Sequence, residues 1–163
     1  MVTKLAFLLV SIFVITGCTS KTPPTTTTIQ LGNESFTLDL ATDVRSRTRG
    51  LMYETSIPIN GGLLFVFPDR QERSFWMKNC VIDIDIAFLD SRGIVTAIHT
   101  MVVEPPQRKD EHPIAYDERL RSYRSFGPAQ FAIELRAGTF SRLHIRVNDR
   151  IPLELPMLKG LAR

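Results

Sequence analysis

The residues best suited to chemistry lie together in the middle of the chain, in the run Phe75-Trp76-Met77-Lys78-Asn79-Cys80. This run holds the chain's single tryptophan and one of its two cysteines. An indole beside an ammonium offers a stacking surface next to a cation, which suits a sugar, an aromatic group or a peptide segment. Alternatively, Trp76 fills the core and the stem of Lys78 covers its edge while the ammonium stays in water. The sequence favours neither interpretation.

Two other groupings of reactive side chains have simpler explanations. Asp83 and Asp85 have the spacing of paired carboxylates for acid–base chemistry or calcium, but the polar face of a half-exposed strand gives the same pattern. Cys80 and His99 have the residue types of a thiolate–imidazole pair, although a free cysteine is more often buried and inert. No motif has the spacing of a zinc site, a phosphate cradle or a hydrolytic triad. We therefore expect no metal, no cofactor and no catalytic residue.

The first residues have the pattern of a bacterial lipoprotein leader. Lys4 precedes an apolar run that ends at Gly17 and Cys18 and is shorter than the ~20 residues a transmembrane helix needs. Ile15-Thr16-Gly17-Cys18 resembles a lipobox, and this resemblance implies that Cys18 becomes the first mature residue and carries lipid. The alternative is an ordinary leader that is cut elsewhere. We expect an exported protein anchored to the membrane by its N-terminal lipid, in the periplasm or on the outer cell surface.

Composition and length bound the rest of the chain. Residues 1–17 are expected to be the signal peptide, 18–28 a threonine- and proline-rich tether, 29–155 one globular domain and 156–163 a C-terminal tail. The chain has 20 Lys and Arg against 17 Asp and Glu, a net charge of +3 that is too mild to indicate nucleic acid. With Cys18 committed to lipid, Cys80 has no intrachain partner, so stability must come from burial.

The domain reads as a series of strands with few helices. Gly32-Asn33 forms the turn of a hairpin over 29–40, and Thr42 or Asp43 caps a short helix that runs through Arg49 and ends at Gly50. The apolar run 63–67 is typical of a strand buried on both faces, broken at Pro68. Further strands are expected at 74–79, 82–88, 94–103, 131–135 and 151–155, with a second short helix at 139–145.

This order of elements predicts an α+β fold. We expect a β-rich, curved, largely antiparallel sheet or partly closed barrel with one or two short helices. The polar stretch 104–123 is longer than usual connections and is either a solvated insertion or a lid.

Several motifs occur in a characteristic order along the domain. These are Arg49-Gly50-Leu51-Met52, the glycine pair before 63–67, Phe75 to Asn79, Asp85 with Phe88 and Asp90, and 134–138. Together they resemble the family called domain of unknown function 192, which implies a compact β-rich domain, often exported, without established activity. Cys80 stands where threonine is usual, so it is not carried over as a catalytic residue. A site common to the family would use Arg49, Met52, Trp76, Lys78, Asn79, Asp85 and Glu134.

Three functions are compatible with these features. We expect a lipid-anchored cell-envelope protein whose domain binds a small ligand or an envelope partner around Trp76, Lys78 and Arg49, without turnover. The first alternative is a small hydrolase or transferase acting on envelope polymers, with Asp85 or Glu134 as acid or base. The second is a structural accessory lipoprotein whose motif residues only hold the fold together. Whichever function holds, we expect Asp85, as part of the shared motif, to form a structural ion pair with Arg49 or Lys78.

Overall fold

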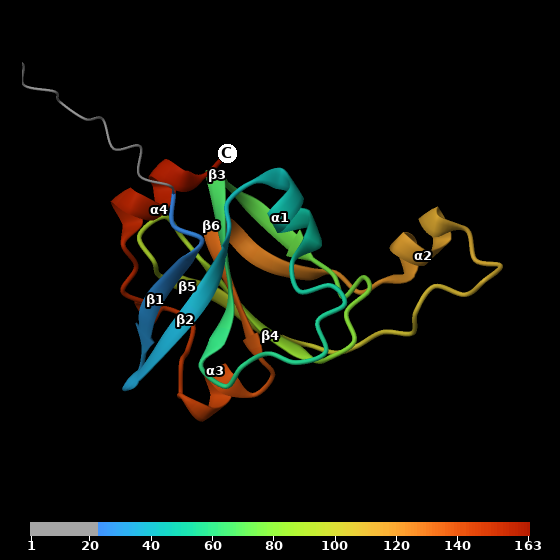
Figure 1. Cartoon of the computed structure of the whole chain (residues 1–163), viewed down its shortest axis with the longest axis horizontal. Helices are drawn as coiled ribbons and strands as arrows, with labels where there is room; N and C mark the ends of the chain where they lie inside the picture. Colours follow the sequence, from blue (N-terminus) through green and yellow to red (C-terminus); the bar gives the residue numbers. More distant parts are fainter. Residues whose placement is uncertain (1–22) are drawn as a thin grey trace, which may run out of the picture.

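The computed structural model describes residues 23–163, which form a six-stranded open sheet with four short helices (Figure 1). The strand order is β1-β2-β3-β6-β4-β5, and every neighbouring pair is antiparallel except β2 with β3. The α+β class is therefore confirmed, as an open mixed sheet. The expected leader and residues 18–22 of the expected tether lie outside the described residues.

The strands are β1 (Thr26–Leu31), β2 (Glu34–Ala41), β3 (Gly61–Phe75), β4 (Ile84–Leu89), β5 (Val95–Met101) and β6 (Tyr123–Arg136). The helices are α1 (Val44–Arg49), α2 (Pro113–Arg119), α3 (Thr139–Arg142) and α4 (Leu155–Leu161). The hairpin of β1 and β2 confirms its prediction. So does α1, where Asp43 and Ser46 form a capping box and Gly50 ends the helix with a φ of 49°.

The longest pairing joins β3 to β6 and differs from expectation. Pro68 does not end β3, because the two register shifts between Val66 and Gln71 and between Glu72 and Ser74 let the ladder continue around irregular backbone. The strand expected at 74–79 is wrong, since β3 ends at Phe75 and a tight turn follows. Asn79 adopts a φ of 55° in this turn, a left-handed conformation that asparagine tolerates.

Two apolar clusters cover the two faces of the sheet. Alternate residues of β3 supply both, with Leu64 and Val66 on one face and Phe65 and Phe67 on the other. This two-sided burial explains the continuous apolar run 63–67. The face of Leu64 is covered by α3 and α4, and the face of Phe65 carries α1 (Figure 1).

The C-terminal residues pack against the domain. The strand expected at 151–155 is wrong, because only an isolated bridge from Ile94 to Arg150 forms there. Leu158 of α4 is fully buried in the apolar cluster that contains Leu64. The backbone N–H of Arg163 donates to the carbonyl of Thr42 at 2.8 Å, which ties the end of the chain to the start of α1.

Residues 104–122, called here the arm, project from the sheet and carry α2 (Figure 1). The arm has its own ion pair at 2.6 Å between Glu111 and Arg119. Tyr116 of α2 is only 2% exposed, and its hydroxyl accepts a hydrogen bond from the backbone N–H of Asn79 at 3.3 Å. The arm therefore packs against the turn that follows β3 and includes Trp76 and Asn79, called here the Trp76 turn. Among the described residues, no helix is long and apolar enough to cross a membrane.

Candidate functional site

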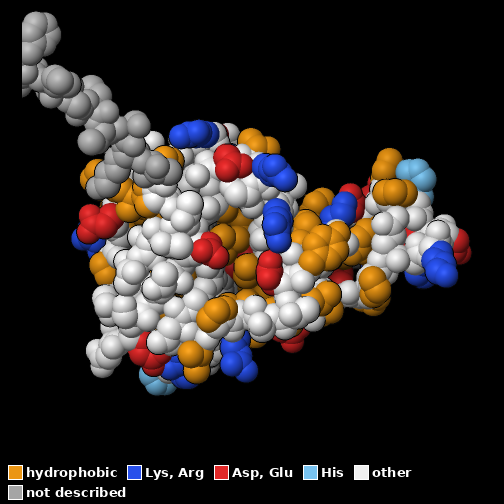
Figure 2. Space-filling view, viewed as in Figure 1, with side chains coloured by type: hydrophobic (Ala, Val, Ile, Leu, Met, Phe, Trp, Pro, Cys, Tyr) orange, Lys and Arg blue, Asp and Glu red, His pale blue; other side chains and the backbone are white. Residues whose placement is uncertain are grey.

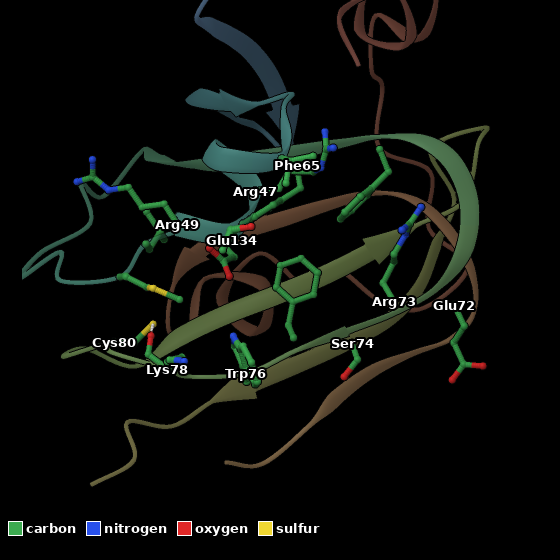
Figure 3. A pocket seen from close by; sticks show the side chains of 17 residues that line it. Arg47, Arg49, Phe65, Glu72, Arg73, Ser74, Trp76, Lys78, Cys80 and Glu134 are labelled. Carbon is green, nitrogen blue, oxygen red and sulfur yellow. Dashed lines mark hydrogen bonds between the residues drawn. The ribbon is translucent and has the colours of Figure 1, made fainter. Parts of the chain in front are cut away.

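A pocket of about 440 Å³ lies between α1 and the end of β3 (Figure 3). One wall is α1 with the residues after it, from Arg47 to Met52. The opposite wall comes from β3 and the Trp76 turn, and β6 contributes Glu134. The pocket therefore gathers side chains from three parts of the chain that are far apart in sequence.

Glu134 lies at the closed end of this pocket, between the two walls in Figure 3. It pairs with Leu63 of β3 and Ile86 of β4, which fixes it in the middle of the sheet. Its side chain is 5% exposed, and its Oε2 atom has no hydrogen-bond partner among residues 23–163. Burial raises the pKa of this carboxyl to about 8, so it is largely protonated at neutral pH.

Gly50 lies next to the Glu134 carboxyl at the end of α1. A Cβ atom at this position would lie 3.7 Å from Glu134 Oε2 and 3.4 Å from the ring of Phe65. The positive φ that ends α1 also favours glycine here. These distances are ordinary van der Waals contacts, so the positive φ is the reason for glycine at this position.

Aromatic rings line the pocket from the closed end to the rim. Phe65 and Phe75 meet edge to face with ring centroids 4.9 Å apart. Trp76 is 44% exposed at the rim, so it does not fill the core. The ammonium of Lys78 lies 5.3 Å from the centroid of the indole ring, which confirms that the two side chains are neighbours.

Lys78 also joins the pocket to the arm. Its Nζ atom lies 2.6 Å from Asp117 Oδ1 of α2, and both side chains are about a quarter to a third exposed. The ammonium is 5.9 Å from the ring centroid of Tyr116 as well. Lys78 therefore has a positioning role besides its place on the pocket wall.

Two arginines of the pocket were missed by sequence reasoning as site residues. Arg47 donates to the backbone carbonyls of Thr42 and Arg163 at 2.7 Å each. Arg73 lies 4.1 Å from the ring centroid of Phe67 and pairs with Asp69. Nothing in the local pattern separates them from surface arginines, because long-range contacts fix them: Arg47 donates to Val66 and Arg163, and Arg73 donates to Ala129 of β6.

Arg49 is the most accessible of the basic groups that line the pocket. Its side chain is 68% exposed, and Glu54 approaches its guanidinium at 3.3 Å. Figure 2 shows basic side chains gathered over α1, beside an apolar patch at the base of the arm. The guanidinium of Arg49 is thus a solvent-exposed cation at the rim of the pocket.

Seven residues were expected to form a common site, and the structure brings five of them together. The pocket is lined by Arg49, Met52, Trp76, Lys78 and Glu134. Asn79 does not line it, but its carbonyl accepts a hydrogen bond from the N–H of Tyr53 at 2.9 Å. Together with its contact to Tyr116, this bond makes Asn79 a support for the turn that presents Trp76.

Asp85 is separated from the pocket by the sheet. It pairs in register with Leu135, whereas Glu134 pairs with Ile86, so the two carboxyls point to opposite faces. Asp85 is 2% exposed, and it accepts hydrogen bonds from Thr100 Oγ1 at 2.7 Å and from the N–H of Phe140 at 3.1 Å. The expected ion pair with Arg49 or Lys78 is wrong.

The expectation that Asp83 and Asp85 share the solvent-facing side of a half-exposed strand is also wrong. All six residues of β4 are buried, since α3 covers the face that was expected to meet solvent. Asp83 precedes β4 and is exposed, and its carboxylate accepts a hydrogen bond from the N–H of Val103 at 2.8 Å. The two aspartates therefore do not form a paired carboxylate site.

Cys80 and His99 do not form a thiolate–imidazole pair. Cys80 lines the pocket, and burial together with the nearby Glu134 raises the pKa of its thiol to about 12. Its thiol is therefore protonated at neutral pH and weakly nucleophilic. His99 lies elsewhere, with Nε2 at 2.8 Å from the carbonyl of Arg124 and its ring against Tyr123 and Phe126.

The sequence profile of the domain of unknown function 192 family, described as "Uncharacterized ACR", matches residues 26–153. The chain belongs to this family. Its DUF192 region includes every strand and every residue that lines the pocket, whereas α4 lies beyond the matched range. No curated protein matches the chain.

Two crystal structures resemble this DUF192 protein. One is of a candidate transcription regulator from Sinorhizobium meliloti 1021, with a TM-score of 0.62 and 28% identity over 77% of this chain and 89% of that one. The other is of a protein of unknown function from Novosphingobium aromaticivorans DSM 12444, with a TM-score of 0.63 and 22% identity over 77% of this chain and 82% of that one. The second likeness concerns the fold alone.

Proposed function

We propose that this chain is a lipid-anchored protein of the cell envelope, in the periplasm or on the outer surface, whose domain binds a small ligand or envelope partner without turnover. The observation that carries the binding role is the Oε2 atom of the pocket-lining Glu134, which is buried and has no hydrogen-bond partner among residues 23–163. A buried polar atom without a partner costs about 1–3 kcal/mol. A ligand that donates a hydrogen bond there recovers this cost, which supports binding over a purely structural role.

The hydrolase or transferase alternative now depends on Glu134. Asp85 is held on the far face of the sheet by Thr100 and Phe140, so it does not act in this pocket. A carboxyl protonated near neutral pH has the property of a general acid. Binding remains the stronger proposal because the adjacent thiol of Cys80, with a pKa of about 12, is not an activated nucleophile.

The lipid anchor rests on the leader and lipobox pattern around Cys18. Mass spectrometry of the N-terminal peptide of the mature protein should find Cys18 as its first residue, carrying a diacylglyceryl group. The Cys18→Ser variant should be absent from the membrane fraction after cell fractionation. An uncut leader, or a mature peptide without acyl mass, would contradict the anchor and leave the pocket proposal to its own test.

The pocket can be tested with Trp76 as its reporter, because it is the chain's single tryptophan. We would titrate N-acetylglucosamine, glycylglycine, choline and benzoate while recording intrinsic fluorescence. At least one probe should change the emission of the native protein. Thr48→Phe, at a position that lines the pocket, should abolish the change by filling it, whereas Arg45→Phe, on the same helix but outside the lining, should preserve it. Absence of any change in the native protein, or an unaffected Thr48→Phe variant, would refute the site.

A further inference from the structure

The charges that line the pocket restrict the class of ligand. Four cationic side chains face it, from Arg47, Arg49, Arg73 and Lys78, against the carboxyls of Glu72 and Glu134. With Glu134 protonated, Glu72 is the remaining carboxylate of the lining, and three of the four cations pair with Glu54, Asp69 or Asp117 just outside it. The side chains that face a ligand are therefore mainly cationic, which favours an anionic group over a cationic one.

The cations differ in how fully they are already engaged. Arg47 is bound by backbone carbonyls, Arg73 by Asp69 and the ring of Phe67, and Lys78 by Asp117. Arg49 has one partner at 3.3 Å, and both members of that pair are largely in solvent. Such exposed pairs are weak, so Arg49 can exchange Glu54 for the carboxylate of a ligand at little cost. Its planar guanidinium suits a bidentate carboxylate.

At the Glu134 end of the pocket, a neutral hydrogen-bonding group of the ligand is favoured over a carboxylate. A protonated carboxyl both donates and accepts hydrogen bonds, as a hydroxyl group does. Glu134 Oε2 is buried without a partner, so a hydroxyl placed there satisfies an atom that the described residues leave unsatisfied. The ligand thus needs neutral hydroxyls at one end and a carboxylate at the other.

The walls and the size of the pocket supply the third constraint. Trp76 presents apolar ring area at the rim, and Phe75 and Phe65 continue it inward. Aromatic rings stack on the apolar faces of sugar rings. The volume of about 440 Å³ is near the lower end of the range for small-molecule sites, which fits one or two sugar rings.

We propose that this pocket binds an acidic sugar, a pyranose that carries a carboxylate. Its ring lies against Trp76, its hydroxyls reach Glu134 and its carboxylate pairs with Arg49. The inference rests on the proposed binding function and names its ligand class. The sugar is either a free monosaccharide or the terminal unit of a glycan, and the two share the same recognition chemistry.

Calorimetric titrations with three methyl glycosides of one ring size test the charge preference in the native protein. The probes are methyl β-D-glucuronoside, methyl β-D-glucoside and methyl β-D-glucosaminide, which are anionic, neutral and cationic. The expected order of affinity is glucuronoside, then glucoside, then glucosaminide. Equal or tighter binding of the neutral or the cationic glycoside would overturn the proposal.

Two arginine variants on the same helix test the role of Arg49. Arg49→Ala should weaken binding of the glucuronoside by about tenfold or more and change that of the glucoside by less than about twofold. Arg45→Ala, which removes an exposed arginine that does not line the pocket, should change neither. An unchanged affinity of Arg49→Ala for the glucuronoside would overturn the proposal.

Further titrations distinguish a free sugar from the end of a glycan, and a failure of the sugar assignment from a failure of the pocket itself. A glucuronosyl-N-acetylglucosamine disaccharide that binds more tightly than the monosaccharide supports a glycan end, and the reverse order supports the free sugar. If all three glycosides fail while a probe of the fluorescence panel binds, the sugar assignment falls and the pocket stands. If the glycosides and the panel all fail, both proposals fall.

Discussion

At the scale of single residues, the function depends on what each buried acid contacts. Glu134 and Asp85 lie on adjacent central strands and are both almost fully buried. Asp85 has two hydrogen-bond donors, whereas Glu134 Oε2 has none among residues 23–163. The satisfied acid is therefore a structural group, and the unsatisfied one is the basis of the proposed binding site.

Glu134 should make the stability of the protein depend on pH. Its pKa rises from an ordinary 4.5 to about 8 on folding, so between these values the folded state holds a proton that the unfolded state has lost. Folding then takes up a proton, and stability falls as pH rises, by ~1.4 kcal/mol per pH unit. Urea denaturation should show the native protein losing up to about 4 kcal/mol relative to Glu134→Gln between roughly pH 5 and pH 8.

The exposed Glu72, which also lines the pocket, provides the matched control. Glu72→Gln should keep the pH dependence of the native protein. If the stability difference between the native protein and Glu134→Gln were the same at both pH values, the buried acid would not have a raised pKa.

Asp85→Ala should destabilise the domain without affecting the pocket. The change leaves Thr100 Oγ1 and the N–H of Phe140 without their acceptor inside the protein, at a cost of about 3 kcal/mol. Asp83→Ala, at an exposed position, should cost less than about 1 kcal/mol. Thermal unfolding and Trp76 titrations measure the two effects separately, and a loss of ligand binding by folded Asp85→Ala would restore this residue to the site.

At the scale of elements, the sequence predicted what local chemistry determines. The Gly32-Asn33 turn and the Asp43 cap of α1 are short-range signals, and both elements form where expected. The continuation of β3 past Pro68 was missed because it depends on pairing with β6, which lies some sixty residues away in the chain. The family motif pointed to Trp76 and Glu134. It did not show that Arg47 and Arg73 lie beside them, because that proximity arises from contacts between distant parts of the chain.

The arm should loosen when its link to the pocket is removed. Lys78→Ala removes the ion pair with Asp117, a partly exposed contact of about 0.5–1 kcal/mol. Amide hydrogen exchange in residues 113–119 should become about two- to fivefold faster. Arg108→Ala, which removes a longer contact of 3.7 Å to Glu111 within the arm, should change these rates less. Unchanged exchange in Lys78→Ala would show that Tyr116 alone holds the arm.

At the scale of the whole molecule, the sheet separates a face covered by helices from the face that carries the proposed binding pocket. One face is sealed by α3 and α4 around an apolar cluster, and the other carries α1 and the pocket. The division explains why substitutions on the two faces should have different effects. It also explains why two neighbouring acids of one sheet have unrelated roles.

The C-terminal helix should contribute to the stability of the domain although it lies beyond the family match. Leu158→Ala removes a fully buried side chain and should cost about 3 kcal/mol in denaturant unfolding. Met157→Ala, at a position 38% exposed on the same helix, should cost less than about 1 kcal/mol. Equal effects of the two substitutions would mean that α4 does not pack on the core in solution.

Chemical-shift mapping by NMR during titration with the four panel probes and the three glycosides tests the pocket most directly. We expect a binding probe to shift the amide signals of residues 48–52, the indole N–H of Trp76 and the amide of Glu134, while the amides of Asp85, Phe140 and Leu158 stay unchanged. Shifts confined to the face of α3 and α4, or no shift with any probe, would contradict this expectation.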